Sequence, residues 1–150
     1  MLKIGDDAPD FDAVDHKGQA VSLSDFKERY VVLWFYPKAD TPGWTIEGCE
    51  FRDLKSSFDE EGASVLGVSF DSIEENLAFH EKFGFNFPLL CDTERQMGVA
   101  YGAASDNQSS HAARIGVVVG PNSKIISWMG KVDAKKFPQQ VLDIIRQDKS

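Results

Sequence analysis

An uninterrupted apolar run, Tyr30–Tyr36 (YVVLWFY), constrains the fold of this chain more than any other segment. Pro37 follows it directly. A strand with one face in water alternates apolar and polar residues, whereas a strand buried on both faces is apolar throughout. The run therefore predicts a strand inside a sheet that is covered on both sides. Ala63–Phe70 (ASVLGVSF) predicts a second strand of this kind.

A helical pattern follows each of these two strands. After the turn signal Thr41-Pro42-Gly43, side chains that could form a buried face recur at helical spacing from Ile46 to Phe58. After the second strand, Ser72 and Glu75 form a capping box. Gly84 provides the stop of that helix, and we expect Ile73 on its buried face.

Shorter patterns complete the predicted fold. They are extended segments at Phe11–Asp15 and Ala20–Leu23, a strand at Pro88–Cys91, a helical turn at Gln96–Tyr101, a hairpin of Ile115–Val119 and Lys124–Trp128, and a last helix from Asp133 to about Gln147. Parallel βαβ units followed by an antiparallel hairpin and a terminal helix predict an α/β fold with a mixed central sheet flanked by helices. The thioredoxin-like fold is one such arrangement. We expect a single domain over residues 1–150.

Charge and composition exclude several classes of protein. The chain has 16 basic and 24 acidic residues and a net charge of −8, which disfavours nucleic acid as a partner. No apolar run approaches the roughly 20 residues of a membrane span. The first residues lack the pattern of a signal peptide, so we expect a cytoplasmic protein without a membrane partner. Two cysteines, Cys49 and Cys91, form neither a disulfide framework nor a zinc site.

The segment from Pro37 to Asp53 is the one most informative about chemistry. It leaves a buried strand and enters a helix, and a helix start offers unpaired backbone N–H groups and the positive end of a dipole. A thiol there has a lowered pKa and becomes a good nucleophile. Position 44 is the place for such a thiol, but the residue is Trp44, whose indole is no nucleophile.

This segment resembles the peroxiredoxin active-site loop, Pro-x-x-x-Thr-x-x-Cys. It also resembles the extension Thr-x-Glu-x-Cys-x-Phe-Arg-Asp of the bacterioferritin-comigratory, or Q-type, group. The matching residues are Pro37, Thr41, Thr45, Glu47, Cys49, Phe51, Arg52 and Asp53, while Trp44 stands where the family has its peroxide-attacking cysteine. The opening Gly5–Phe11 also resembles the family's start, and Arg114 matches its active-site arginine. The similarity covers nearly the whole chain.

The resemblance implies a role for each matching residue. Thr41 would hydrogen-bond the peroxide, Pro37 would shield the site, and Arg114 would stabilise the thiolate and the charge that develops on oxygen. The nucleophile would become a sulfenic acid, and Cys49 would condense with it as the resolving thiol. Thioredoxin or a similar dithiol would then reduce the disulfide. The family implies hydroperoxide substrates, no cofactor, no metal, and a monomer or weak dimer.

Helix geometry restricts the resolving step. Positions 44 and 49 would differ by about 7.5 Å in rise and about 140° in rotation on a continuous helix. Because Cα atoms in a disulfide lie about 4.4–6.8 Å apart, a bond between these positions requires the first helical turn to unwind. Indole is far larger than a thiol, so either the Trp44 side chain fills the peroxide pocket or this turn unwinds and the ring swings out, and we expect the second.

Trp44 leaves three explanations open. The chain is a natural relative without activity, an engineered block of the active site, or a form in which a selenocysteine codon, UGA, was read as tryptophan. We predict a thioredoxin-dependent hydroperoxide reductase whose present form is inactive. The alternative is a redox-silent binding module on a thioredoxin-like scaffold. Four further residues match no catalytic position and are expected to be structural: Cys91, His16, His80 and His111.

Overall fold

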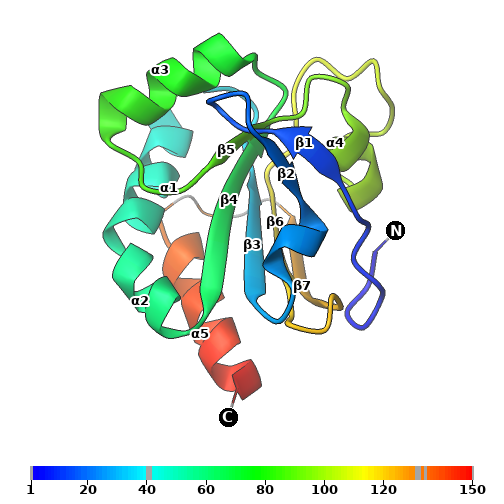
Figure 1. The fold of residues 1–150 in the computed structure, drawn as a ribbon, viewed down its shortest axis with the longest axis vertical. Coiled ribbons are helices and arrows are strands. Elements are labelled where there is room, and N and C mark those ends of the chain that lie inside the picture. Colours follow the sequence, from blue (N-terminus) through cyan, green and yellow to red (C-terminus); the bar gives the residue numbers. More distant parts are fainter. Residues whose placement is uncertain (1, 40–41, 131–132, 134, 150) are drawn as a thin grey trace.

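A five-stranded mixed sheet forms the centre of the structure, a computed structural model that describes residues 2–39, 42–130, 133 and 135–149. Its strand order is β5-β4-β3-β6-β7 (Figure 1). The strands are β3 (Tyr30–Phe35), β4 (Ala63–Ser69), β5 (Leu89–Cys91), β6 (Ile115–Val119) and β7 (Ile125–Gly130). The β3–β4 and β4–β5 pairs are parallel, whereas β3–β6 and β6–β7 are antiparallel. The predicted mixed sheet is confirmed.

Strand β3 is buried on both faces, as its sequence predicts. All its residues are buried, and successive side chains enter opposite halves of the core. Val32 and Trp34 belong to one apolar cluster, and Val31, Leu33 and Phe35 belong to the other. The strand lies between β4 and β6 in the middle of the sheet.

Two different layers cover the two faces of the sheet (Figure 1). One face packs against α1 (Pro42–Asp53), α2 (Lys55–Glu60), α3 (Ile73–Phe83) and α5 (Phe137–Lys149). The other packs against α4 (Gln96–Tyr101), the hairpin of β1 (Asp12–Val14) and β2 (Ala20–Ser22), and the 3-10 helix η1 (Leu23–Phe26). None of the helices among the described residues is long and apolar enough to cross a membrane.

The predicted caps of α3 are present. The Ser72 hydroxyl accepts a hydrogen bond from the Glu75 N–H at 3.2 Å, and the Glu75 carboxylate accepts one from the Ser72 N–H at 3.0 Å. Gly84 ends the helix at φ 61°, a left-handed conformation that glycine adopts without steric penalty.

The expectations for α1 need three corrections. The helix is regular from Pro42, so its first turn is not unwound, and proline suits this position because its missing N–H has no helical partner. The helix expected to continue to Phe58 is interrupted at Leu54, where ψ is 6°. Ile46 is 49% exposed, because Glu47, Gly48 and Phe51 form the buried face instead.

Candidate active site

The sheet register brings the two ends of the candidate site together. Phe35, the last residue of β3, pairs with Ile115, the first residue of β6. Arg114, directly before β6, therefore lies at the same end of the sheet as Pro37 and the start of α1. Arg114 is exposed and Pro37 is half-buried. Two distant parts of the chain thus converge at the carboxyl end of β3.

The remaining residues of the predicted site are described only in part. Thr41 lies outside the described residues. The backbone of Trp44 lies in the first turn of α1, but its side chain is also outside what the structure describes. The first turn of a helix directs unpaired N–H groups at whatever group stands there, which favours an anion at this end.

Asp71 connects the loop before α1 to the neighbouring strand. Its Oδ2 accepts a hydrogen bond from the Ala39 N–H at 2.7 Å. Lys38 forms an ion pair with the same carboxylate, at 4.0 Å, and with Glu75, at 3.6 Å. Sequence analysis missed this role for Asp71. Its position directly after a buried strand of a parallel sheet was the available signal.

Two motif residues, Phe51 and Arg52, fix the C-terminal half of α1 in place. Phe51 is 0% exposed and contacts the rings of Trp34, Phe87 and Phe137. Arg52 Nη1 donates a hydrogen bond to the Phe83 carbonyl at 2.6 Å.

Gly48 lets the helix approach the core closely. A Cβ at this position would lie 2.6 Å from the Phe85 ring and 3.0 Å from the Trp34 ring. No larger residue fits here without displacing these rings.

The two cysteines occupy different environments. Cys49 is a free, half-buried thiol in the second turn of α1, where a continuous helix keeps it apart from position 44. Cys91 is buried at the end of β5, and its sulfur accepts a hydrogen bond from Asn76 Nδ2 at 3.4 Å. Burial raises the pKa of the Cys91 thiol, which favours the unreactive protonated form.

Glu47, a motif residue of α1, is completely buried, which its charge does not predict. It is 0% exposed, and neither carboxyl oxygen has a hydrogen-bond partner among the described residues. Burial raises its pKa to about 9, although the Trp34 indole and the Arg114 guanidinium act in the opposite direction. Trp34 Nε1 is the indole group that acts on the carboxyl, but the two do not form a hydrogen bond of ordinary geometry. The carboxyl is therefore neutral at pH 7.

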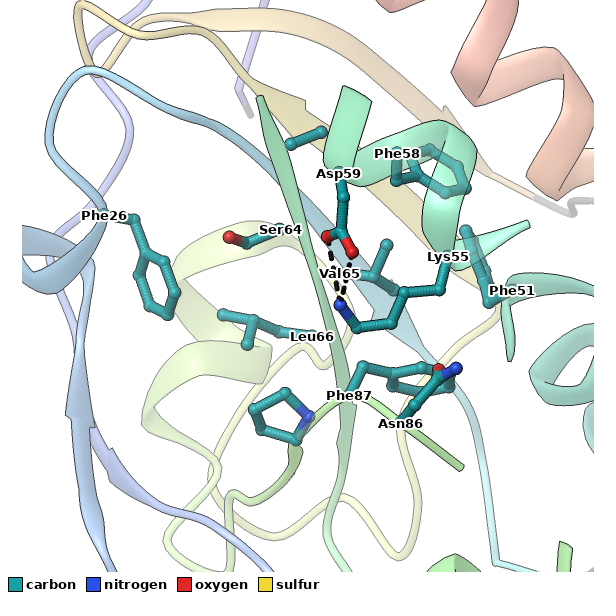
Figure 2. Close-up of a pocket in the computed structure, with 12 residues that line it drawn as sticks. Phe26, Phe51, Lys55, Phe58, Asp59, Ser64, Val65, Leu66, Asn86 and Phe87 are labelled. Carbon is teal, nitrogen blue, oxygen red and sulfur yellow. Dashed lines mark hydrogen bonds and ion pairs between the residues drawn. The ribbon is translucent and has the colours of Figure 1, made fainter. Parts of the chain in front are cut away.

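Other features of the described residues lie apart from this end of the sheet. A cavity of about 210 Å³ is lined by the first half of β4, by α2 and by Phe26, at the opposite end from α1's first turn (Figure 2). Lys55 and Asp59 form an ion pair at its rim. Within the described ranges, no group of three or more potential metal ligands comes together.

Comparison with known proteins identifies the family. Residues 4–128 match the model of the AhpC/TSA family. The chain belongs to the AhpC/TSA family. Peroxiredoxin Bcp of Bacillus subtilis is 46% identical over 100 residues, which are 67% of this chain and 64% of that relative. The match therefore spans just under two thirds of the length of this relative.

Solved structures extend the similarity over the whole fold. Peroxidoxin BcpB from Mycobacterium tuberculosis superimposes with a TM-score of 0.93 at 30% identity, and all of both chains are covered. The bacterioferritin comigratory protein of Xanthomonas campestris gives a TM-score of 0.89 at 28% identity, covering 100% of this chain and 99% of that one. The predicted thioredoxin-like fold is confirmed, and the Bcp-type relatives support the predicted group within the AhpC/TSA family.

Proposed function

We propose that this chain has the scaffold of a thiol peroxidase that reduces hydrogen peroxide and organic hydroperoxides, with thioredoxin or a similar dithiol as reductant. The observation that carries the proposal is the convergence of Pro37, Arg114 and the first turn of α1 at one end of the sheet. The Xanthomonas campestris relative supports the substrate class, since it is described as having alkyl peroxide reduction activity. The proposal includes one cytoplasmic domain that is a monomer or weak dimer.

The proposed chemistry needs a thiolate at position 44. Its sulfur would attack one peroxide oxygen and break the O–O bond, forming a sulfenic acid and releasing an alcohol or water once the leaving oxygen gains a proton. Thr41 would hydrogen-bond the peroxide, and Arg114 would stabilise the negative charge on sulfur and oxygen. Pro37, half-buried beside this end of the sheet, would limit access of water.

We further propose that Trp44 occupies the peroxidatic position and leaves the present chain inactive. Indole cannot displace a peroxide oxygen as a thiolate does. Cys49 does not replace the missing nucleophile, because it lies more than one helical turn beyond the start of α1. The three origins that sequence analysis left open, a natural inactive relative, an engineered block and a misread selenocysteine codon, all agree with this arrangement.

The test is to restore the nucleophile with Trp44→Cys. We expect a thiol whose pKa lies below the free value of about 8.5, because it stands at a helix start near Arg114. The variant should consume peroxide with thioredoxin as reductant and accumulate an intramolecular disulfide with Cys49. Stopped-flow kinetics and mass spectrometry after one equivalent of peroxide would measure both steps, while the native chain shows only slow thiol oxidation.

Two further substitutions separate the steps in the Trp44→Cys background. Cys49→Ser should leave the first oxidation intact and block the disulfide. Arg114→Ala should slow the peroxide step by about 10²-fold or more, as loss of one charge-stabilising group does elsewhere. Rapid turnover by the chain with Trp44 would instead assign the nucleophile to Cys49.

A redox-silent binding module is the second candidate, and Trp44 itself is the observation that favours it. If Trp44→Cys folds normally and remains inert towards peroxide, the scaffold has lost its peroxidase function beyond one residue. The binding-module proposal then takes precedence.

A further inference from the structure

Glu47 combines complete burial with a lack of hydrogen-bond partners. Its side chain is 0% exposed, and both carboxyl oxygens are unpartnered among the described residues. An unpaired buried polar group lowers the stability of the folded chain even when it is neutral. At the adjacent Gly48, the backbone of α1 lies so close to the rings of Phe85 and Trp34 that no side chain fits between them. This part of the helix therefore holds a group that gains free energy by reaching water.

The surroundings of Glu47 do not stabilise a charge there. The charged groups that act on it from packed elements are Arg114, before β6, and Asp133, before α5, and they act in opposite directions. Trp34, from β3, directs its indole N–H at the carboxyl and favours the charged form, but without a hydrogen bond of ordinary geometry. Burial outweighs these influences and keeps the carboxyl protonated.

The same segment of α1 must open for the proposed disulfide step. Position 44 and Cys49 lie on a continuous helix that holds them apart, and Glu47 stands between them. Any opening that frees the helix up to Cys49 also carries Glu47 into water. We propose that Glu47 is a positioning residue that controls the opening of the first turns of α1, and hence the approach of position 44 to Cys49. The disulfide part of this inference rests on the proposed function, whereas the opening itself does not.

Proton release accompanies the opening. The packed helix holds Glu47 as a carboxylic acid, and the opened helix exposes a carboxylate while one proton passes to water. In the restored enzyme, the sulfenic acid at position 44 and the Cys49 thiol then form the S–S bond and release one water molecule. Because packing raises the pKa of Glu47 to about 9, the packed helix is most stable below the ordinary carboxyl value and loses stability as the pH rises towards 9.

Hydrogen exchange of the native chain tests the opening directly. Opening constants for α1 amides are measured from pH 5 to 8, corrected for intrinsic exchange, with α5 amides as reference. We expect an increase approaching about tenfold per pH unit in α1, since one proton is released. Glu47→Gln should abolish this slope, whereas Glu50→Gln, a matched change at a half-buried glutamate of the same helix, should retain it. Glu47→Leu provides a second uncharged variant if Glu47→Gln does not fold.

An equal slope in the native chain and in the Glu47 variants overturns the proposal. Exchange of α1 amides only together with those of α5 also overturns it, because the opening is then global. In the Trp44→Cys background, Glu47→Gln should reduce the pH dependence of disulfide formation by one proton and leave the part that any thiol condensation has, while the thioredoxin step is unchanged. If Trp44→Cys consumes no peroxide, the proposed function fails, and the exchange experiment still decides the role of Glu47.

Discussion

Helices α1 and α3 pack on the same face of the sheet, and each buries one polar side chain completely. On α3, Asn76 accepts a hydrogen bond from the Tyr36 hydroxyl at 2.6 Å and donates to Ser69 Oγ at 3.2 Å and Cys91 Sγ at 3.4 Å. On α1, Glu47 has no such partner among the described residues. Both side chains are 0% exposed. The difference indicates that α3 is bound to the sheet by its polar group, while α1 is held despite its polar group.

The largest effect on stability is expected from breaking the α3 side of this comparison. Asn76→Ala leaves the buried Tyr36 hydroxyl without its partner, removes one of the hydrogen bonds of Ser69 Oγ, and opens a small cavity. We expect the free energy of unfolding to fall by about 2–4 kcal/mol, measured by urea denaturation.

Asn86→Ala is the matched control for this change. Asn86 is exposed and donates one hydrogen bond to the Arg52 carbonyl at 3.3 Å. The loss should be below about 1 kcal/mol. Equal losses in the two variants would show that the buried network around Asn76 contributes nothing specific.

Removal of the buried polar group of α1 is expected to raise the free energy of unfolding, whereas removal of Asn76 lowers it. Glu47→Leu replaces a buried carboxyl that has no hydrogen bond of ordinary geometry by an apolar side chain in an apolar environment, and the Trp34 indole N–H is the one hydrogen-bond donor that acts on it among the described residues. We expect the free energy of unfolding at pH 7 to rise by about 1–3 kcal/mol, and urea denaturation would measure the rise. A loss of stability comparable to that of Asn76→Ala would mean that Glu47 has a partner outside the described residues.

A pair of histidines, the buried His16 and the half-buried His80, is intermediate between Asn76 and Glu47 in how fully its polar atoms are hydrogen-bonded. The rings of His16 and His80 stack at 3.8 Å. His16 Nδ1 accepts a hydrogen bond from the Leu89 N–H at 3.4 Å, but its Nε2 has no partner among the described residues. Burial and then the neighbouring His80 lower the pKa of His16, and burial lowers that of His80.

Protonation of these rings therefore favours the unfolded chain. Stability should be lost as the pH falls below about 6.5, with a slope of up to about 1.4 kcal/mol per pH unit for each proton taken up. This sign is opposite to that of Glu47, so the measurement belongs in the Glu47→Leu background. Comparison with the same chain carrying His16→Gln and His80→Gln isolates the contribution. An unchanged slope would assign the acid sensitivity to other groups.

Sequence analysis succeeds where burial leaves a direct mark on the residues. β3 and β4 were predictable because two-sided burial requires an unbroken apolar run. The ends of α3 were predictable because Ser72, Glu75 and Gly84 act locally.

It fails where tertiary packing selects which face of a helix is buried. The apolar pattern places Ile46 and Ile73 inward, yet they are 49% and 39% exposed, while Glu47 and Asn76 take the buried positions. For Asn76 the reason is the partners that β3, β4 and β5 supply, which lie far away in the sequence. For Glu47 it is the close approach that the neighbouring Gly48 permits.

For the candidate site, the sequence predicted which parts of the chain come together, but the roles of the individual residues stay predictions. The motif indicated Pro37 and Arg114, and the register of β3 and β6 brings their ends of the sheet together. Cys49 lies on α1 as the motif implies, but its role as resolving thiol stays a prediction. The contributions of Thr41 and the Trp44 side chain also stay predictions, since both lie outside the described residues.

The smallest effect on stability is expected from removing the N-terminal cap of α3, and it tests whether the first turns of α1 and α3 open independently. Ser72→Ala removes the hydroxyl that accepts the Glu75 N–H and leaves one orphan donor at the start of α3. We expect a loss of about 1 kcal/mol and faster hydrogen exchange confined to the first turn of α3. Because the cap acts locally, the pH-dependent exchange of α1 should not change. If the amides of α1 exchange faster as well, the two helices open together. The inference that α1 opens by itself while α3 stays packed on the sheet is then wrong.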